Sequence, residues 1–99
     1  MILTVLEAKV EPGRESELRA AYESAGTKLP PGLVRSELLR DDRDTTRWRI
    51  QTLWENRAAL DAVRSAGTPP GVLMFRAAGA EPVLAVFGVM STLRRAVDA

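Results

Sequence analysis

The chain has 99 residues, which suits one small domain with a modest hydrophobic core. It carries 14 basic and 13 acidic residues, so its net charge of +1 gives no strong attraction to nucleic acid or to a membrane surface. It contains neither Cys nor His, which excludes disulfides, thiolate nucleophiles, and both the commonest metal ligand and the commonest general base.

The first quarter of the chain predicts a strand followed by a helix. Residues 2–10 alternate as a strand, and Pro12 and Gly13 end it. A helix is predicted over residues 14–25, with Gly26 as its stop. Its buried stripe is expected to consist of Leu18, Ala21, Tyr22 and Ala25.

Residues 47–56 are central to the predicted fold, because a strand is predicted to end there and a helix to begin. Alternation places four of its side chains on one face: Trp48, Ile50, Thr52 and Trp54. Asn56 suits the N-cap of a second helix, predicted over residues 57–66. We expect Trp48 to fill the core, whereas Trp54 lies at a strand-to-helix junction, where pockets often open.

Two further strands flank this stretch. Residues 33–40 predict a strand that a short polar turn joins to the next one, so the two should pair antiparallel. After a Pro-rich loop at residues 68–71, a short helical piece is predicted over residues 72–78 and a last strand over residues 82–90. We therefore expect a single domain over residues 1–90, with residues 91–99 as a tail or a short helix.

The order β-α-β-β-α-β predicts a ferredoxin-like α+β sandwich, in which two helices cover one face of a four-stranded antiparallel sheet. The helices are expected on the more apolar face, which carries Ile2, Leu6, Ala8, Val34, Leu38, Trp48, Ile50 and Trp54. The opposite face mixes apolar and charged side chains: Leu3, Val5, Glu7, Arg35, Glu37, Leu39, Arg49, Gln51 and Leu53. That mixture suits a sheet that packs on a second sheet, so a homodimer is expected through this face.

Three other patterns have simpler explanations than a functional site. The carboxylates of residues 41–44 lack the Gly and distal Glu of a calcium loop and suit a solvated turn. Arg47 and Arg49 beside Trp48 could suggest RNA binding, but the first strand carries no aromatic residue. The glycines of residues 67–79 form no phosphate-binding fingerprint and mark turns instead.

Most of the chain, from residue 2 to about residue 90, resembles the antibiotic biosynthesis monooxygenase family of small dimeric α+β barrels. The residues that carry the resemblance are the strand Ile2–Val10 with Pro12-Gly13, Leu29-Pro30-Pro31-Gly32-Leu33, Thr52-Leu53-Trp54-Glu55-Asn56-Arg57 with Ala59-Leu60, and Phe75-Arg76-Ala77-Ala78-Gly79. The family implies a homodimer with one cavity per subunit between sheet and helices. Some members oxidise phenols or anthrones to quinones with O₂ and without metal or flavin, whereas others degrade haem or isomerise lactones.

The resemblance also implies where a site should lie. Trp54 corresponds to the cavity Trp of the quinone-forming members, and Arg76 corresponds to their cavity Arg. Their cavity Asn and Tyr correspond here to Ile50 and Leu60. The first-strand Asn, the helix Trp and the haem-ligating His of the haem-degrading branch correspond to Leu6, Val63 and Gly79, so the resemblance does not extend to haem degradation by that route in a chain without His.

Two functions remain open from the sequence. The first is a cofactor-independent monooxygenase acting on a planar aromatic phenol, with Trp54 stacking on the ring, Arg76 stabilising an oxyanion and Tyr22 as the available phenol. Its substrate contacts would be Ile50, Thr52, Leu60, Val63 and Phe75. The second is a non-catalytic homodimer that binds a hydrophobic small molecule, which the apolar residues Ile50 and Leu60 favour.

For either function we expect no metal and no cofactor, and neither nucleic acid nor a membrane as partner. The apolar start of the chain lacks the basic leader of a signal peptide, and no stretch is long enough to span a bilayer. A soluble cytoplasmic protein is therefore expected.

Overall fold

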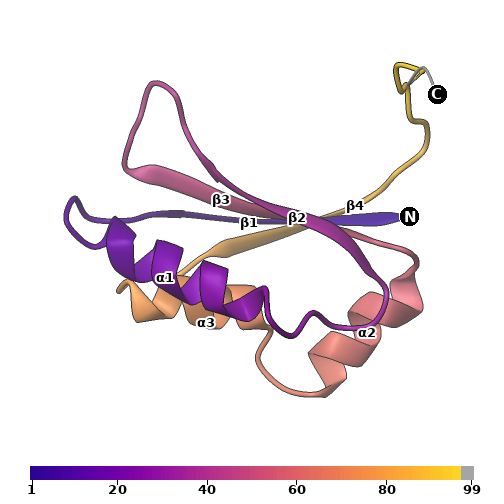
Figure 1. Ribbon diagram of the computed structural model, residues 1–99, viewed down its shortest axis with the longest axis horizontal. Helices are drawn as coiled ribbons and strands as arrows, with labels where there is room; N and C mark the ends of the chain where they lie inside the picture. The colour runs from indigo at the N-terminus through magenta and orange to yellow at the C-terminus, as the bar shows by residue number, and fades with distance from the viewer. Residues whose placement is uncertain (97–99) are drawn as a thin grey trace.

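The computed structural model describes residues 1–96 and shows a four-stranded antiparallel sheet with helices on one face (Figure 1). The strand order is β2-β3-β1-β4, which is the order of a ferredoxin-like α+β fold. This confirms the fold class predicted from the order of elements. The elements are β1 (Ile2–Lys9), α1 (Glu15–Ala25), β2 (Leu33–Arg40), β3 (Arg47–Trp54), α2 (Arg57–Ser65), α3 (Pro70–Ala77) and β4 (Val83–Gly88).

The helix that packs beside α1 under the sheet is α3, not α2 (Figure 1). The short helix predicted over residues 72–78 begins earlier, at Pro70, because proline is tolerated in the first turn of a helix, where its missing N–H has no partner to lose. The second predicted helix, α2, lies instead beside the end of β3. The helices therefore pack closely together where α1 contacts α3, and less closely where α2 begins.

The closed part of the helical layer holds the hydrophobic core. Leu18 of α1 and Phe75 of α3 have no exposed surface, and Trp48 of β3 is only 3% exposed. Their neighbours in the core are Leu6, Ala8, Val10, Ile50, Ala78 and Ala80. The guanidinium groups of Arg19 and Arg40 lie 5.6 and 5.7 Å from the centre of the Trp48 ring, so two cation–π contacts flank this core tryptophan.

The strand-to-helix junction after Trp54 forms as the sequence predicts. The Asn56 side chain accepts a hydrogen bond of 2.9 Å from the backbone N–H of Ala59, which caps α2. The backbone N–H of Glu55 donates to the carbonyl oxygen of Gly32 at 2.9 Å, which ties the end of β3 to the start of β2. Gly32 has φ of +83°, and a Cβ there would collide with the side chain of Ala59.

A β-bulge interrupts the start of β2. Leu33 pairs with Trp54 and Arg35 pairs with Leu53, which leaves Val34 as the extra residue. Val34 is consequently 45% exposed, although alternation places it on the helix-covered face. From Ser36 onward the register is regular, with Ser36 opposite Thr52.

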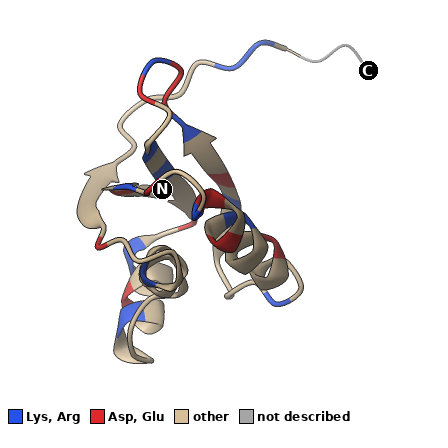
Figure 2. Ribbon diagram, turned by 90° about the vertical axis from the view of Figure 1, so that its left-hand side faces the viewer, with Lys and Arg blue, Asp and Glu red and all other residues tan. Residues whose placement is uncertain are grey.

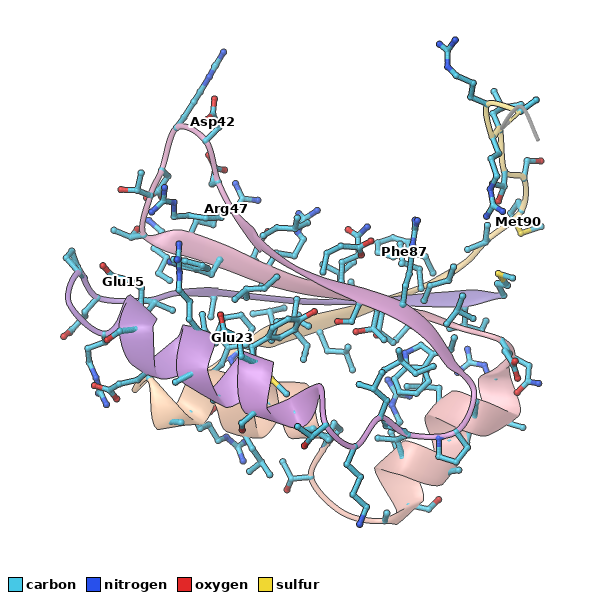
Figure 3. The ribbon with its side chains drawn as sticks, viewed as in Figure 1. Glu15, Glu23, Asp42, Arg47, Phe87 and Met90 are labelled. Atoms are coloured by element: carbon cyan, nitrogen blue, oxygen red, sulfur yellow. The ribbon has the colours of Figure 1, made fainter. Side chains whose placement is uncertain are left out.

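The face of the sheet away from the helices is open (Figures 1 and 3). Phe87 of β4 points outward from it and is 53% exposed. Residues 91–96 contain no helix, and residues 97–99 of the expected tail lie outside the described part of the chain. Acidic and basic residues are mixed along the helices and the β2–β3 turn (Figure 2), as the balanced composition predicts.

Candidate functional site

A cavity of 430 Å³ lies between the sheet and the helices, at the end of β3 that carries Trp54. Its floor is the helix-facing side of β1, β2 and β3, and its walls come from all three helices and the loops before β2 and α3. Most of its lining is apolar, which is typical of a small-molecule site. The cavity lies where α1 and α3 no longer pack against each other, between the ends of these helices, α2 and the sheet.

Trp54 forms part of the cavity wall. It is 6% exposed, and its Nε1–H donates a hydrogen bond of 3.1 Å to the Thr4 hydroxyl on the neighbouring strand. That bond fixes the plane of the indole ring and satisfies its one polar group. The indole ring therefore presents an aromatic surface of fixed orientation to the cavity.

A row of hydroxyl groups crosses the cavity floor over three strands. Ser36 lies opposite Thr52, and Thr52 lies opposite Thr4. The Tyr22 O–H donates to Ser36 Oγ at 2.9 Å, and Ser36 Oγ lies 3.2 Å from Thr52 Oγ1. The Thr4 hydroxyl donates to the backbone carbonyl of Thr52 at 3.4 Å. The polar part of this floor is thus neutral and connected, with several lone pairs and protons that a ligand oxygen can share.

The structure brings together six of the eight residues that the sequence predicts for the site. These six line the cavity: Tyr22, Ile50, Thr52, Trp54, Leu60 and Val63. Ile50, Thr52, Trp54 and Leu60 are all more than nine-tenths buried, so they form its inner wall.

Phe75 and Arg76 lie elsewhere. Phe75 is fully buried in the core beside Leu18, so it has no surface toward the cavity. Arg76 is on the outer side of α3 and forms a bidentate pair with Glu81, with Nε–Oε2 and Nη2–Oε1 distances of 2.9 and 2.8 Å. This pair raises the pKa of Arg76 and lowers the pKa of Glu81. The expectation that Arg76 faces the cavity is not met, because one helical step separates it from the buried position of Phe75.

None of the carboxylates in residues 1–96 lines the cavity. Glu7, on the open face of β1, accepts hydrogen bonds from Arg47 at 3.0 Å and Arg49 at 2.9 Å, which lower its pKa. Asp41 Oδ1 accepts from two backbone N–H groups of the β2–β3 turn, which lower the pKa of Asp41. Residues 1–96 hold no cluster of carboxylates arranged for a metal ion.

Sequence reasoning missed part of the site. Thr4 and Ser36 share the helix-covered face by alternation, but a lone hydroxyl in a strand gives no signal of function. Lys28 and Arg64, which also line the cavity, come from a loop and from the last turn of α2. No periodicity predicts that both of these charged residues line one cavity.

Comparison with known proteins identifies the fold and the family. SnoaB, a cofactor-independent oxygenase from Streptomyces nogalater, superposes with a TM-score of 0.71 at 18% identity, with 95% of this chain and 97% of that one covered. A candidate antibiotic biosynthesis monooxygenase from Deinococcus radiodurans gives a TM-score of 0.74 at 11% identity, with 98% and 100% covered. A variant of MhuD, solved with two manganese protoporphyrin IX molecules per active site, gives 0.72 at 22% identity, with 96% and 100% covered.

At these identities the three structures establish a shared fold only. No helix within residues 1–96 is long and apolar enough to cross a lipid bilayer. Among proteins with curated functions, none matches the chain by sequence. The family model for antibiotic biosynthesis monooxygenases matches residues 1–68, which is more than half of the sequence, so the chain belongs to the antibiotic biosynthesis monooxygenase family.

Proposed function

We propose that this protein is a cofactor-independent monooxygenase that oxidises a planar aromatic phenol of the anthrone type with O₂. The observation that carries the proposal is the cavity itself, with Trp54 as its aromatic wall and the hydroxyl row as its polar floor. Family membership supports the same reaction class, and SnoaB, a protein of the same fold, is described as a cofactor-independent oxygenase.

The substrate supplies all the electrons for such a reaction. An anthrone loses a proton from its CH₂ group, and the resulting carbanion reacts with O₂. The net change converts CH₂ to C=O, with one oxygen atom entering the product and the other leaving as water. The protein has to exclude bulk water, hold the ring, and stabilise the negative oxygen of the deprotonated substrate.

The hydroxyl row suits the oxyanion role that the resemblance assigns to Arg76. The Tyr22 hydroxyl, which hydrogen-bonds to Ser36, can turn to donate its hydrogen bond to the negative oxygen of the deprotonated substrate. Ser36 keeps its contact with Thr52, so the rest of the hydroxyl row stays hydrogen-bonded. Trp54 holds the ring, while Ile50, Leu60 and Val63 supply apolar contact.

Oxygen consumption with anthrone tests the proposal. The purified protein, treated with a chelator, should consume O₂ and form anthraquinone faster than the uncatalysed reaction. Tyr22→Phe should lower the rate about a hundredfold, in the range for loss of one hydrogen-bond donor to an oxyanion. Ser24→Ala removes an exposed hydroxyl of the same helix and should leave the rate unchanged. Quinone formation no faster than in buffer would contradict the proposal.

A second candidate is a non-catalytic protein that binds a hydrophobic small molecule. One observation favours it: no carboxylate within residues 1–96 lines the cavity, and the chain has no His to act as a base. A protein of this kind would bind anthrone and consume no O₂, so the same experiment separates the two functions.

We also propose that two copies associate through the open face of the sheet. Leu39, Val83 and Phe87 expose 40%, 74% and 53% of their surface there. Beside them, Arg35 pairs with Glu37 at 3.4 Å, and Glu7 pairs with Arg49, which gives the face both signs of charge. Apolar side chains framed by charge pairs are typical of a contact surface between proteins.

Sedimentation measures this association. Phe87→Glu should raise the dimer dissociation constant at least tenfold, because it places a charge among apolar contacts. Glu37→Ala should also weaken the dimer, because it leaves Arg35 without its partner. Leu73→Glu changes an equally exposed residue on α3 and should have no effect. A wild-type protein that remains monomeric at micromolar concentration would rule out the proposal.

A further inference from the structure

The charged residues that line the cavity are all positive. Lys28, Arg35 and Arg64 belong to its lining, and no Asp or Glu of residues 1–96 does. The chain as a whole is nearly neutral, with 14 basic and 13 acidic residues, so this asymmetry is local. The cavity lining therefore carries a positive charge that the protein's net charge does not explain.

These charges lie at the entrance and not on the floor. Lys28 follows α1 and Arg64 is in the last turn of α2, whereas Arg35 borders the cavity from β2 and pairs with Glu37 on the open face of the sheet. All three residues are exposed, whereas the floor residues Thr52 and Ile50 are buried. A ligand that fills the apolar interior would thus meet the cations at its solvent-facing end.

Two of the three charges have no partner in the described part of the chain. Arg35 forms an ion pair with Glu37 at 3.4 Å. Within residues 1–96, neither Lys28 nor Arg64 forms an ion pair with a carboxylate. Both side chains are therefore able to bind an anionic group without first breaking an internal pair.

We infer that the ligand of this cavity is an amphipathic anion: a planar apolar ring system that carries a carboxylate at one end. The rings lie against Trp54 and the hydroxyl row, and the carboxylate lies at the entrance between Lys28 and Arg64. This inference rests on the proposal that the cavity binds a planar aromatic molecule, and it adds the charge and the orientation of that molecule.

A matched pair of probes tests it. Anthracene-2-carboxylate and anthracene-2-methanol have the same rings and differ in charge. Titration of each, followed by quenching of tryptophan fluorescence, gives two dissociation constants for the wild-type protein. We expect the carboxylate to bind roughly tenfold more tightly at low salt, the size expected for two exposed charge contacts, and this preference to shrink as salt is added.

Variants test whether the charged residues at the entrance cause the preference for the carboxylate probe. The double variant Lys28→Gln with Arg64→Gln should lose the preference while it keeps its affinity for the neutral alcohol. Arg57→Gln removes the same charge from the same helix but outside the cavity lining, and it should retain the preference. All these side chains are exposed, so the substitutions leave the core intact.

The possible results distinguish this inference from the proposed aromatic binding site on which it rests. Equal binding of the two probes by the wild type, or a preference that survives in the double variant, overturns the inference and leaves the aromatic site standing. Failure of both probes to bind overturns the aromatic site and the inference together.

Discussion

The two tryptophans of β3 lie on the same face of the same strand and have different surroundings. Trp48 is packed against Leu18 and Phe75 and is flanked by two arginine side chains. Trp54 is almost as buried, at 6% against 3%, but it faces a cavity of 430 Å³. Strand alternation decides which face a side chain occupies. The helices above that face decide whether the space around it is filled.

The largest expected contrast is in stability. Trp48→Ala should lower the free energy of unfolding by about 3–5 kcal/mol, because it opens a void in a packed core. Trp54→Ala should cost clearly less, since part of its ring already borders empty space. Urea unfolding followed by circular dichroism measures both values. Equal losses for the two variants would show that the Trp54 end is as tightly packed as the Trp48 end.

A smaller effect is expected for Trp54→Phe, which keeps an aromatic ring and removes the N–H that bonds to Thr4. Stability should fall by about 1 kcal/mol, the usual value of one hydrogen bond, while the affinity for anthracene-2-methanol falls about tenfold. Trp48 remains as the only emitter in this variant, so ligand quenching should drop sharply. Unchanged quenching would remove Trp54 from the binding site.

The smallest effect concerns the open face behind Trp48, where Glu7 pairs with Arg47 and Arg49. These hydrogen bonds lower the pKa of Glu7 in the folded state. A lowered pKa gives stability that is present above the ordinary pKa of a glutamate, about 4.3, and is lost as the pH falls through the lower folded value.

The variant Glu7→Gln should therefore lose less stability than the wild type between pH 7 and pH 3. The difference should stay below about 1 kcal/mol, because solvent screens these half-exposed charges. Thermal unfolding at the two pH values measures it. Glu23→Gln, on α1 and without an ion pair in residues 1–96, is the control. A Glu23 effect as large as that of Glu7 would contradict the assignment.

Much of the fold could be predicted because its signals are local. The alternation of β3, the Asn56 cap and the Pro-rich loops each act over a few residues, and the structure confirms the strand order that they imply. The pairing of α1 with α3 could not be predicted in this way. It depends on how the chain after α2 turns back under the sheet, which no single segment encodes.

The same distinction between local and long-range signals decides which residues of the site could be predicted. Trp54, Ile50 and Leu60 line the cavity where alternation and the helix cap place them. Arg76 does not, because its position was assigned by the resemblance, and Glu81 nearby binds it on the outside of α3. Lys28 and Arg64 line the same cavity from a loop and from the end of a helix, and no local pattern predicts that arrangement.

The place of β1 in the middle of the sheet also affects how the chain acquires its structure. Ile2 pairs with Trp54 on one side and with Gly88 on the other, so the first strand must wait for partners far along the sequence. Closing such long loops lowers the entropy of the chain before any stabilising contact has formed, and non-local pairing is therefore slow. During synthesis on a ribosome, the residues of β1 would emerge first but would be among the last to reach their native pairing. The edge of β1 that pairs with β4 would remain unpaired until nearly the whole chain had been made.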